Sequence, residues 1–370
     1  MATKSRSYKS QKTLSSLLVN GILIFISLLW FVPTLGVLVT SFRNSEDIFR
    51  SGWWTIFPHK AYIESGEIKV EEGVDVNAPM MIEGAGPYTF EELRAGVTLP
   101  DGRKLTWYGN KRTRLIKVAE QKWQGFDLNL TMDNYTNTMS GKEIRFRDAS
   151  GNEIVRMGNN LGGAFLNSIA VAVPATIIPI LIAAFAAYGF AWLNFPGRKF
   201  FFTIVVALIV VPLQIALVPI LQDYTKLNLN GTYLAMWLAH TGFGLPLAVY
   251  LLFNYISQIP RDILESAFID GASNFTIFTQ LILPLSVPAL ASFAIFQFLW
   301  VWNDYLVALT FLGDKTRVIT SALAAIVGEK GQDWHLLTSG AFLSMILPLA
   351  VFFALQRYFV RGMMAGSVKG

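Results

Sequence analysis

Residues 265–284 read ESAFIDGASNFTIFTQLILP, and this stretch decides how the rest of the chain is interpreted. It is polar and suited to helix formation, yet it lies between two long apolar runs that carry almost no charge. A segment of this kind is typical of a loop at a membrane surface. Its landmarks, in chain order, are Glu265, Ser266, Ala267, Gly271, Leu283 and Pro284.

The composition places the chain in a lipid bilayer. Hydrophobic residues make up 53% of the sequence and charged residues only 15%, whereas soluble domains usually carry about 25% charged residues. Six uncharged runs can each supply the roughly 20 residues with which a helix crosses about 30 Å of hydrocarbon. They cover approximately residues 14–41, 161–195, 200–222, 227–256, 272–303 and 336–356. The sequence therefore predicts an all-α polytopic membrane protein with six transmembrane helices.

The first apolar run could be mistaken for a cleavable secretory signal, because basic residues precede it: Lys4, Arg6, Lys9 and Lys12. The run is too long for such a signal, and no small-residue cleavage site follows in Phe42-Arg43-Asn44. We therefore expect residues 1–42 to remain as an N-terminal tail and a first span.

The basic residues of the short loops predict the orientation. With the N-terminus in the cytoplasm, that side collects Lys4, Arg6, Lys9, Lys12, Arg198, Lys199, Arg261, Arg357, Arg361 and Lys369. The opposite short loops keep fewer basic residues, namely Lys226, Lys315, Arg317 and Lys330. Acidic residues accompany each of them. The positive-inside rule thus predicts that both termini and the loop 258–284 are cytoplasmic, and that residues 43–160 are external.

The external residues 43–160 are expected to form a soluble insertion rich in Gly and charged residues. Alternating side chains predict strands at residues 104–108 and 143–147. Turn signals at Asp101-Gly102 and at residues 149–152 would close hairpins. We expect a small, β-rich α+β domain.

One short helix is also expected in the insertion. Thr89 and Glu92 fit a capping box at its start, and Gly96 would end it. The chain contains no cysteine, so this domain cannot be stabilised by a disulfide in oxidising surroundings. It must depend on its own small core or on packing against neighbouring chains.

The loop 258–284 has the pattern of a short helix, a bend and a second helix. Pro260 suits the first helical turn, where its missing N–H would be unpaired anyway, and Gly271 can adopt the left-handed conformation that ends a helix. The first helix has one apolar stripe, formed by Ile263, Leu264, Ala267 and Phe268. A second apolar set precedes Pro284, where we expect the chain to turn into the fifth span: Phe275, Ile277, Phe278, Leu281 and Ile282. Periodicity alone also allows an amphipathic hairpin that only anchors the span.

This loop resembles the cytoplasmic loop of permease subunits in binding-protein-dependent ABC importers. In that family a Glu-Ala-Ala start, a Gly and a closing Leu-Pro form the surface that docks on a separate ATPase. Glu265, Ala267, Gly271 and Leu283-Pro284 match this pattern, whereas Ser266 replaces the second Ala with a small change in volume. The resemblance implies that Glu265 is the polar contact at the docking cleft and that Ala267 and Gly271 allow close approach.

Other segments extend the resemblance to most of the chain outside about residues 60–124. They are TMDNY (131–135), FLNS (165–168), VPAT (173–176), WNDY (302–305) and YFVRG (358–362). Together they are similar to the shorter of the two permeases in maltose-type and α-glucoside-type sugar importers. The resemblance implies a type I ABC importer fold in a bacterial inner membrane, with a permease core over 161–360 and a cytoplasmic tail over 361–370 that reaches between the ATPase subunits.

The resemblance also implies the partners. They would be a second homologous permease, a pair of ATPase subunits and a periplasmic solute-binding protein that delivers the sugar. ATP and Mg²⁺ would be used by the ATPase, and this chain would bind no cofactor itself. Two roles for the insertion remain open: a passive spacer, or a contact surface for the binding protein or the partner permease, with aromatic anchors at Trp53, Trp54 and Trp123.

No catalytic motif competes with a transport function. The segment most like a phosphate-binding loop is Gly313-Asp314-Lys315-Thr316, but Ala308 stands where that motif requires its first Gly. ATP chemistry must therefore be supplied by another chain. A metal site is not expected, because there is no cysteine and the three histidines are far apart in the sequence: His59, His240 and His335.

Asp304 is an ionisable residue late in the fifth predicted span. A charge at a helix centre costs about 2.5 to 3.5 kcal/mol on insertion scales, so such residues usually face a protein interior or a water-filled cavity. Asp304 could line or gate the pathway, or it could belong to a structural hydrogen-bond network with Asn303 and Trp302. His240 begins a Gly-interrupted stretch where a substrate could approach or helices could pack closely. The candidate pathway residues are Asn303, Asp304, Tyr305 and His240.

Two classes of function stay open at this stage. The favoured one is a permease subunit of an ATP-driven sugar importer. The alternative is a membrane-embedded enzyme or scaffold whose external domain is the working part; a self-contained secondary transporter ranks third, because the spans lack paired charges. An α-glucoside or similar oligosaccharide as cargo follows from the resemblance alone.

Overall fold

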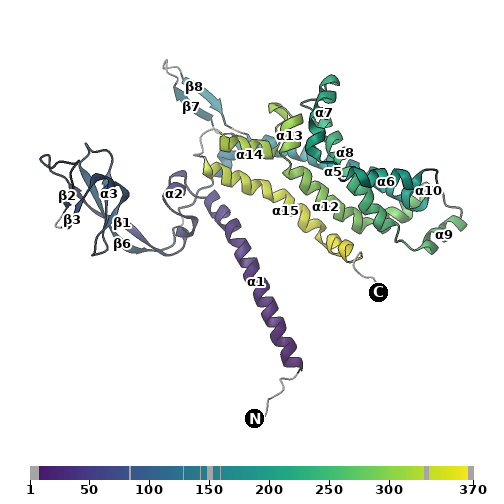
Figure 1. Ribbon diagram of the computed structural model, residues 1–370, viewed down its shortest axis with the longest axis horizontal. Coiled ribbons are helices and arrows are strands. Elements are labelled where there is room, and N and C mark those ends of the chain that lie inside the picture. Colours follow the sequence, from purple (N-terminus) through teal and green to yellow (C-terminus); the bar gives the residue numbers. More distant parts are fainter. Residues whose placement is uncertain are drawn as a thin grey trace, which may run out of the picture. The chain divides into compact units, whose positions relative to one another are not determined.

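The computed structural model describes residues 8–82, 85–127, 129–141, 143–147, 153–158, 160–328 and 333–365. The chain folds into two compact units, and most of their helices and strands are labelled in Figure 1. The helical unit comprises Met1–Ser45 and Thr131–Gly370, and the insertion unit comprises Glu46–Leu130. The chain from Thr131 onward thus belongs to the helical unit, so the compact insertion is shorter than the segment 43–160 expected from the sequence.

Hydrogen bonds between α4 (Asp133–Ser140) and the end of α1 (Tyr8–Ser41) explain this boundary. Asn134 Nδ2 donates to the carbonyl oxygens of Ser41 and Arg43, both at 2.8 Å. The hydroxyls of Ser41 and Tyr135 lie 2.6 Å apart. These contacts join residues more than 90 positions apart, which local sequence patterns do not reveal.

Four helices within the described residues are long and apolar enough to cross a membrane. They are α1, α5 (Leu161–Trp192), α8 (Tyr233–Ile256) and α15 (Trp334–Ala365). Two further apolar segments are bent. α6 (Arg198–Leu208) meets α7 (Leu213–Lys226) at 100°, and Asn274–Leu285 meets α12 (Val287–Asn303) at 71°. The number of spans is six if each bent pair counts as one.

Prolines explain the irregular backbone at the second bend. Pro284 lies inside a helical segment, and the bend falls at Ser286, two residues after the position predicted for it. Because Pro284 has no N–H to donate to the carbonyl four residues earlier, the turn before it widens into a π-helix over Phe278–Ile282. Pro288, in the first turn of α12, removes no helical hydrogen bond, because a backbone N–H at that position would have no partner within the helix.

Short elements complete the helical unit. They are α9 (Arg261–Ile269), α10 (Asn274–Ile277), α11 (Leu283–Leu285), α13 (Leu306–Phe311), a 3₁₀ turn (Asp314–Thr316), α14 (Ile319–Gly328), β7 (Glu143–Arg147) and β8 (Glu153–Met157). β7 confirms the strand predicted at 143–147 and pairs with β8 in an antiparallel hairpin. The turn predicted at 149–152 lies outside the described residues.

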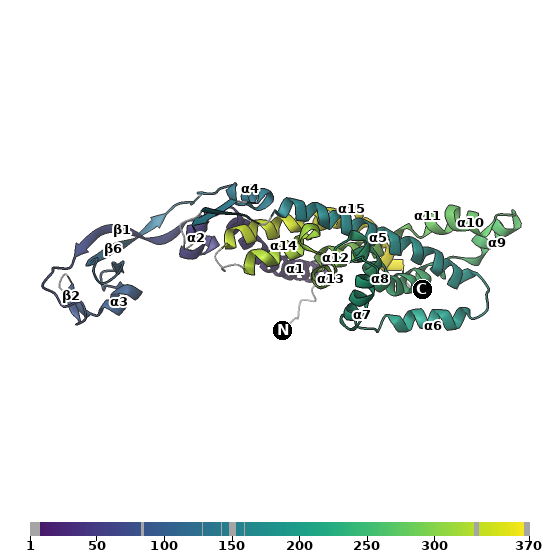
Figure 2. The ribbon, with the colours of Figure 1, turned by 90° about the horizontal axis from the view of Figure 1, so that it is seen from above.

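α5 runs along α8, as the view in Figure 2 shows. Both helices bury several alanines: Ala172, Ala175, Ala183, Ala184 and Ala187 of α5, and Ala235, Ala239 and Ala248 of α8. Small side chains let helix backbones approach closely inside a bilayer, where dispersion contacts replace the hydrophobic effect as the source of helix association. This interface forms the centre of the helical unit.

The insertion unit contains α2 (Ser45–Arg50), a 3₁₀ turn (Trp53–Ile56), α3 (Phe90–Ala95) and six strands. Four of the strands form an antiparallel sheet in the order β1-β6-β5-β4, and β2 pairs with β3. The strands are β1 (His59–Lys69), β2 (Met80–Ile82), β3 (Ala85–Tyr88), β4 (Val97–Thr98), β5 (Lys104–Tyr108) and β6 (Leu115–Gln124). The sheet packs with α3 around a core that includes Leu93, Leu105, Trp107 and Ile116.

Three local predictions for this unit are confirmed. β5 covers residues 104–108, and Asp101-Gly102 turns the chain between β4 and β5, with Gly102 at a φ of +88°. Thr89 and Glu92 form a reciprocal capping box at the start of α3, and the helix ends at Gly96. The hydrogen bonds from Thr89 hold the pKa of Glu92 below its ordinary value, because they favour the ionised carboxylate.

Candidate coupling site and cavity

The loop 258–284 folds as a short helix, a tight bend and a second helix. α9 begins after Pro260 and ends at Ile269. Gly271 follows with a φ of +80°. The Gly271 N–H donates to the Phe268 carbonyl at 3.1 Å, and the next N–H donates to the Ala267 carbonyl at 3.0 Å. These two bonds form a Schellman motif, which requires the left-handed conformation that the sequence predicted for Gly271.

A second helical segment starts immediately after the bend. Ser273 caps it, because its Oγ accepts a hydrogen bond from the Thr276 N–H at 3.1 Å. The segment then continues through α10, the π-helical turn and α11 up to Ser286. The whole loop is thus a continuous structured element with one defined corner at Gly271.

The loop has a buried side and an exposed side. Leu264, Ile277, Phe278 and Ile282 are almost fully buried and pack against α5 and α8. The stripe expected on α9 is therefore divided, because Ile263 and Phe268 point outward instead of joining Leu264. The exposed apolar side chains of the loop include Phe268, Ile269 and Phe275.

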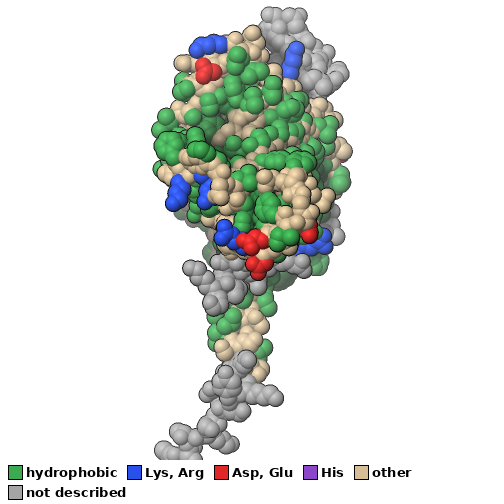
Figure 3. Space-filling model, turned by 90° about the vertical axis from the view of Figure 1, so that its right-hand side faces the viewer, with side chains coloured by type: hydrophobic (Ala, Val, Ile, Leu, Met, Phe, Trp, Pro, Cys, Tyr) green, Lys and Arg blue, Asp and Glu red, His purple; other side chains and the backbone are tan. Residues whose placement is uncertain are grey.

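We call Glu265, Phe268, Ile269 and Phe275 the loop patch. Ile269 is 86% exposed, which is unusual for so large an aliphatic side chain and indicates a surface that another molecule covers. Figure 3 views this end of the helical unit and shows hydrophobic side chains over much of its surface, with charged groups scattered among them.

Glu265 and the other loop residues singled out from the sequence differ in exposure and contacts. The Glu265 carboxylate is 3.8 Å from Arg261 Nε, one turn earlier, and both side chains are mostly exposed. Surface pairs of this kind contribute only about 0.3–0.5 kcal/mol, so a partner can compete for Glu265. Ser266 is also exposed, and its hydroxyl donates to the Ile263 carbonyl at 3.0 Å. Ala267 and Leu283 are half-buried and Pro284 is exposed.

The buried side of the loop is locked to the C-terminal half of α5. The ring of Phe278 stacks on Phe185 with centroids 4.1 Å apart. The Tyr188 hydroxyl donates to Asn274 Oδ1 at 3.3 Å. These two contacts join the loop to α5, which in turn packs along α8.

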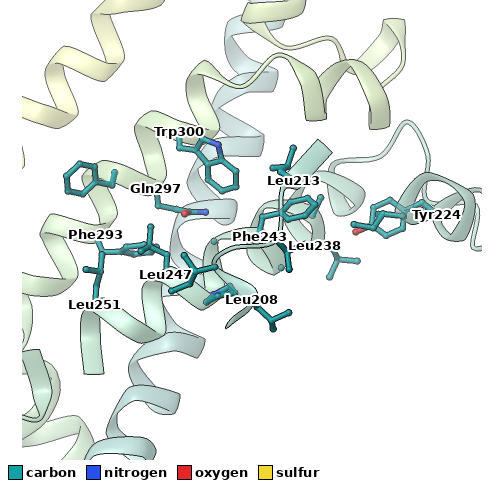
Figure 4. Close-up of a pocket in the computed structure, with 18 residues that line it drawn as sticks. Leu208, Leu213, Tyr224, Leu238, Phe243, Leu247, Leu251, Phe293, Gln297 and Trp300 are labelled. Carbon is teal, nitrogen blue, oxygen red and sulfur yellow. The ribbon is translucent and has the colours of Figure 1, made fainter. Parts of the chain in front are cut away.

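A cavity of about 930 Å³ opens on the helical unit between the α6–α7 bend, α8 and α12. Its walls are mainly aliphatic and aromatic, and the labelled side chains in Figure 4 show Gln297 and Trp300 of α12 facing the same space as Leu247 and Phe243 of α8. The polar groups on the walls include Gln297, Tyr224 and the indole of Trp300.

Gln297 connects three helices at the wall of this cavity. Its Nε2 donates to the Ala175 carbonyl of α5 at 3.1 Å and to the His240 carbonyl of α8 at 3.3 Å. The Ala175 carbonyl would normally accept from the N–H of residue 179, but residue 179 is proline. Gln297 thus satisfies a backbone group that a proline leaves free, as helix interiors in membranes require.

His240 and Asp304 are brought together although they are far apart in the sequence. His240 Nε2 lies 3.6 Å from Asp304 Oδ2, and the imidazole is fully buried with its ring edge-on to Trp300 at 4.9 Å. The Asp304 carboxylate also accepts from the Val307 N–H at 3.1 Å, so it caps the start of α13. Asp304 therefore caps α13, while its carboxylate approaches His240 of α8 without a hydrogen bond to either ring nitrogen.

The other two candidate pathway residues do not join this pair. Asn303 Nδ2 donates to the Leu299 carbonyl at 2.8 Å, and Trp302 Nε1 donates to the Ser344 carbonyl at 3.0 Å. The hydrogen-bond network expected between Asp304, Asn303 and Trp302 is thus replaced by separate partners. Tyr305 is exposed and lines a smaller cavity of about 360 Å³ beside α13 and α14.

Sequence reasoning missed Gln297, whereas it placed Gly244 in a stretch where helices could pack closely. Gln297 is the polar side chain in the middle of α12, and a lone polar residue inside an apolar span is a usable signal for a buried contact. Gly244 lies against it: a Cβ added there would be 2.6 Å from Gln297 Oε1. Within the described residues, no group of three or more His, Cys, Asp or Glu is arranged to hold a metal ion.

Comparisons with known proteins place these features in a family. Residues 179–365 match the family described as binding-protein-dependent transport system inner membrane component. The chain is 45% identical to the alpha-glucoside transport system permease protein AglG of Rhizobium meliloti (strain 1021), over 93% of this chain and 94% of that protein. It is 44% identical to the osmoprotective compounds uptake permease protein GgtD of a Synechocystis strain, over 93% and 89%.

One solved structure has a similar fold. It is a bacterial ABC transporter involved in the import of the acidic polysaccharide alginate, with a TM-score of 0.58 and 14% sequence identity. The match covers 96% of this chain and 100% of the chain in that structure. At this identity the likeness concerns the arrangement of the helices and not the cargo.

Proposed function

The chain belongs to the family of inner-membrane components of binding-protein-dependent transport systems, and we propose that it is the shorter of two permease subunits in an ATP-driven sugar importer. The family match includes the whole of the loop 258–284, together with α8, α12 and α15. In this assignment the external insertion is an accessory part, and the helical unit carries the transport function.

The loop patch is the observation that carries the proposal. It exposes Phe268, Ile269 and Phe275 around the weakly paired Glu265, while the opposite side of the same loop packs on α5 and α8. Such a loop suits contact with another protein on one side and transmission of movement on the other. We assign the partner as an ATPase subunit, which binds ATP and Mg²⁺ and supplies the free energy.

The proposed topology follows from the distribution of Lys and Arg. Both termini and the loop 258–284 face the cytoplasm, where ATP is found, and each bent pair of helices counts as one of six spans. The insertion unit then lies outside, on the side of a periplasmic solute-binding protein. The tail over 361–370 would extend toward the ATPase subunits, although residues 366–370 lie outside the described structure.

The cavity beside α8 and α12 is proposed as this subunit's half of the translocation pathway. Its aromatic walls and the few polar groups on them suit the apolar faces and hydroxyls of a saccharide. We assign His240 and Asp304 to a gate, because the two side chains approach each other where α8 meets the end of α12. Asn303 and Tyr305 lie next to Asp304 in the chain and would face the entrance.

The proposed cargo is an α-glucoside or another oligosaccharide. Its support is the name of a relative that matches nearly the whole chain at 45% identity. A second relative at 44% identity is described as taking up osmoprotective compounds, so a direct comparison of both solute classes is required. Uptake of a labelled α-glucoside, with unlabelled osmolytes as competitors, decides between them.

A charge-reversal experiment tests the docking role of the loop patch. We expect Glu265→Lys to abolish co-purification of the ATPase subunit and solute-stimulated ATP hydrolysis, because it places a cation where the partner meets a carboxylate. Asp223→Lys is the matched control, since Asp223 is an exposed acid on α7, far from the loop in the chain. Equal co-purification with both variants, or ATP-independent uptake by this chain alone, would contradict the proposal.

A further inference from the structure

Exposed aromatic side chains gather at the two ends of the insertion unit. They are Phe49 (60% exposed), Trp54 (61%), Phe57 (45%), Trp123 (70%) and Phe126 (66%). We call these five residues the neck patch, because they come from the segments through which the chain enters and leaves the unit. Among the described residues of the unit, the remaining exposed large hydrophobic side chains are Tyr62, Met81, Tyr108 and Leu130.

The neck patch belongs to an ordered, hydrogen-bonded part of the insertion unit. The Asp127 N–H donates to the Ile56 carbonyl at 3.1 Å, and His59 pairs with Gln124 in the sheet, so the entering and leaving segments lie side by side. The rings of Phe57 and Phe126 are in edge contact with centroids 6.5 Å apart. The sequence also makes room for Trp54, because a Cβ on Gly52 would lie 2.3 Å from the indole ring.

These side chains are not required by the core of the unit. That core is complete without them, with Leu93, Leu105 and Ile116 fully buried. The open face of the sheet is polar in character, with a Lys117–Glu64 ion pair at 2.9 Å and the Lys104 ammonium 5.6 Å from the centre of the Tyr62 ring. Exposed aromatic surface that the fold does not need usually marks a contact with something outside the chain.

Short chain segments connect the neck patch to the end of α1, and their lengths set an upper limit on the separation. α1 ends at Ser41, and the Thr131 N–H donates to the carbonyl of the next residue, Phe42, at 2.7 Å. Phe126 precedes Thr131 by five positions, so at about 3.5 Å per residue it cannot be more than about 18 Å from that point. Phe49 follows Phe42 by seven positions, which allows about 25 Å.

The chemistry of the patch fits the headgroup region of a bilayer. Trp and Tyr concentrate at membrane–water interfaces, where the ring is partly in the apolar phase and its polar edge remains hydrated, and the patch supplies Trp54 and Trp123. Phe and Trp also form the apolar face of amphipathic helices that lie in the interface without crossing the membrane. Lys and Arg, which would add attraction to anionic lipid, are sparse here. Arg50 is the one basic residue in the sequence segments 46–58 and 123–130.

We propose that the neck patch inserts into the outer leaflet of the membrane that α1 crosses. The insertion unit is then anchored by lipid as well as by the two chain segments that connect it to the rest of the protein. The inference rests on α1 spanning the membrane and not on the identity of the cargo. It gives Trp54 and Trp123 a lipid contact in place of the protein partners considered from the sequence alone.

The absence of cysteine from the sequence makes a direct test possible. Single cysteines are introduced as Trp54→Cys, Trp123→Cys and Phe126→Cys and are spin-labelled in the assembled transporter, in nanodiscs of phosphatidylethanolamine and phosphatidylglycerol. Tyr108→Cys is the matched control, because Tyr108 is an exposed aromatic residue on β5, away from the neck. Collision rates of each label with molecular oxygen and with a water-soluble nickel chelate are then measured.

We expect the three neck labels to collide severalfold more with oxygen than with the nickel chelate, and the Tyr108 label to show the reverse. Neck labels as accessible to the nickel chelate as the control would overturn the proposal, since the patch would then be in water. Labels protected from both reagents would also overturn it, because a protein would then cover the patch. Normal co-purification of the ATPase in the same samples separates either failure from a failure of the proposed function.

Discussion

Gly244 and Gln297 show how single residues set the packing of the helical unit. Gln297 occupies the space that a side chain on Gly244 would need, and from there it reaches the backbone of both α5 and α8. Gly242 lies one half-turn away on the same helix and has no neighbouring heavy atom within 4 Å of an added Cβ. Both glycines line the cavity, but Gly244 makes room for a neighbouring side chain and Gly242 does not.

This difference predicts opposite effects of the same substitution. Gly244→Ala should displace Gln297 and destabilise the helical unit by about 1–3 kcal/mol, as overpacking usually does. Gly242→Ala should be neutral or stabilising by up to about 1 kcal/mol, because alanine is the better helix former. Apparent melting temperatures of the purified variants check this, and an equal decrease in both would show that Gln297 does not hold its observed position.

Glu92 predicts a pH dependence confined to α3. Its folded-state pKa is lowered by hydrogen bonds from the Thr89 N–H at 2.7 Å and the Thr89 hydroxyl at 2.9 Å. A lowered pKa stabilises the fold above the unfolded-state pKa, and this contribution is lost as the pH falls through the folded value. Glu92→Gln should therefore reduce hydrogen-exchange protection of α3 at neutral pH, with the difference from the parent vanishing in acid. Glu91→Gln, at an exposed neighbouring position, serves as the control for the loss of one charge.

At the scale of elements, the two sides of the loop 258–284 have different roles. The buried side stabilises the fold, and the exposed side is proposed to contact the ATPase. Leu264 holds α9 on the core, whereas Phe268 on the same helix is exposed. We expect Leu264→Ala to cost about 2–5 kcal/mol of stability, the usual range for a buried leucine. Phe268→Ala should leave the melting temperature unchanged but reduce ATPase co-purification. If Phe268→Ala melts as early as Leu264→Ala, the loop patch is part of the fold rather than a docking surface.

Local patterns predicted the elements whose causes are local. The capping box of α3, the strand β5 and the left-handed Gly271 depend on residues within a few positions of each other, so they could be read from the sequence. The bend between α6 and α7 could not, because an apolar run long enough to span a membrane does not reveal where it turns by 100°. The outward direction of Phe268 was missed for a similar reason, since periodicity gives a stripe but not its neighbours.

Contacts distant in the sequence decided the rest. The pairing of His240 with Asp304 joins α8 to the end of α12, and nothing near either residue indicates it. The bonds of Asn134 to the end of α1 likewise moved the boundary of the insertion unit to Leu130. The candidate site was thus predictable as a set of residues, but its geometry depended on how the helices pack.

At the scale of the whole molecule, the two units suggest separable tasks. His59 and Gln124 are paired neighbours on β1 and β6, so removing residues 60–124 brings two chain ends together that already lie side by side. We expect this deletion to preserve assembly and sugar uptake, because the helical unit retains its core and the loop patch. Transport by the deleted protein checks this, with ATPase co-purification as the control. Loss of uptake with normal assembly would mean that the insertion takes part in transport.

The alanine-rich contact between α5 and α8 has a mechanical consequence. A methyl group has no torsion angle with which to adjust its shape, so the alanines of these two helices give little room for side-chain rearrangement. We therefore expect force applied at one end to reach the other as a joint movement of both helices.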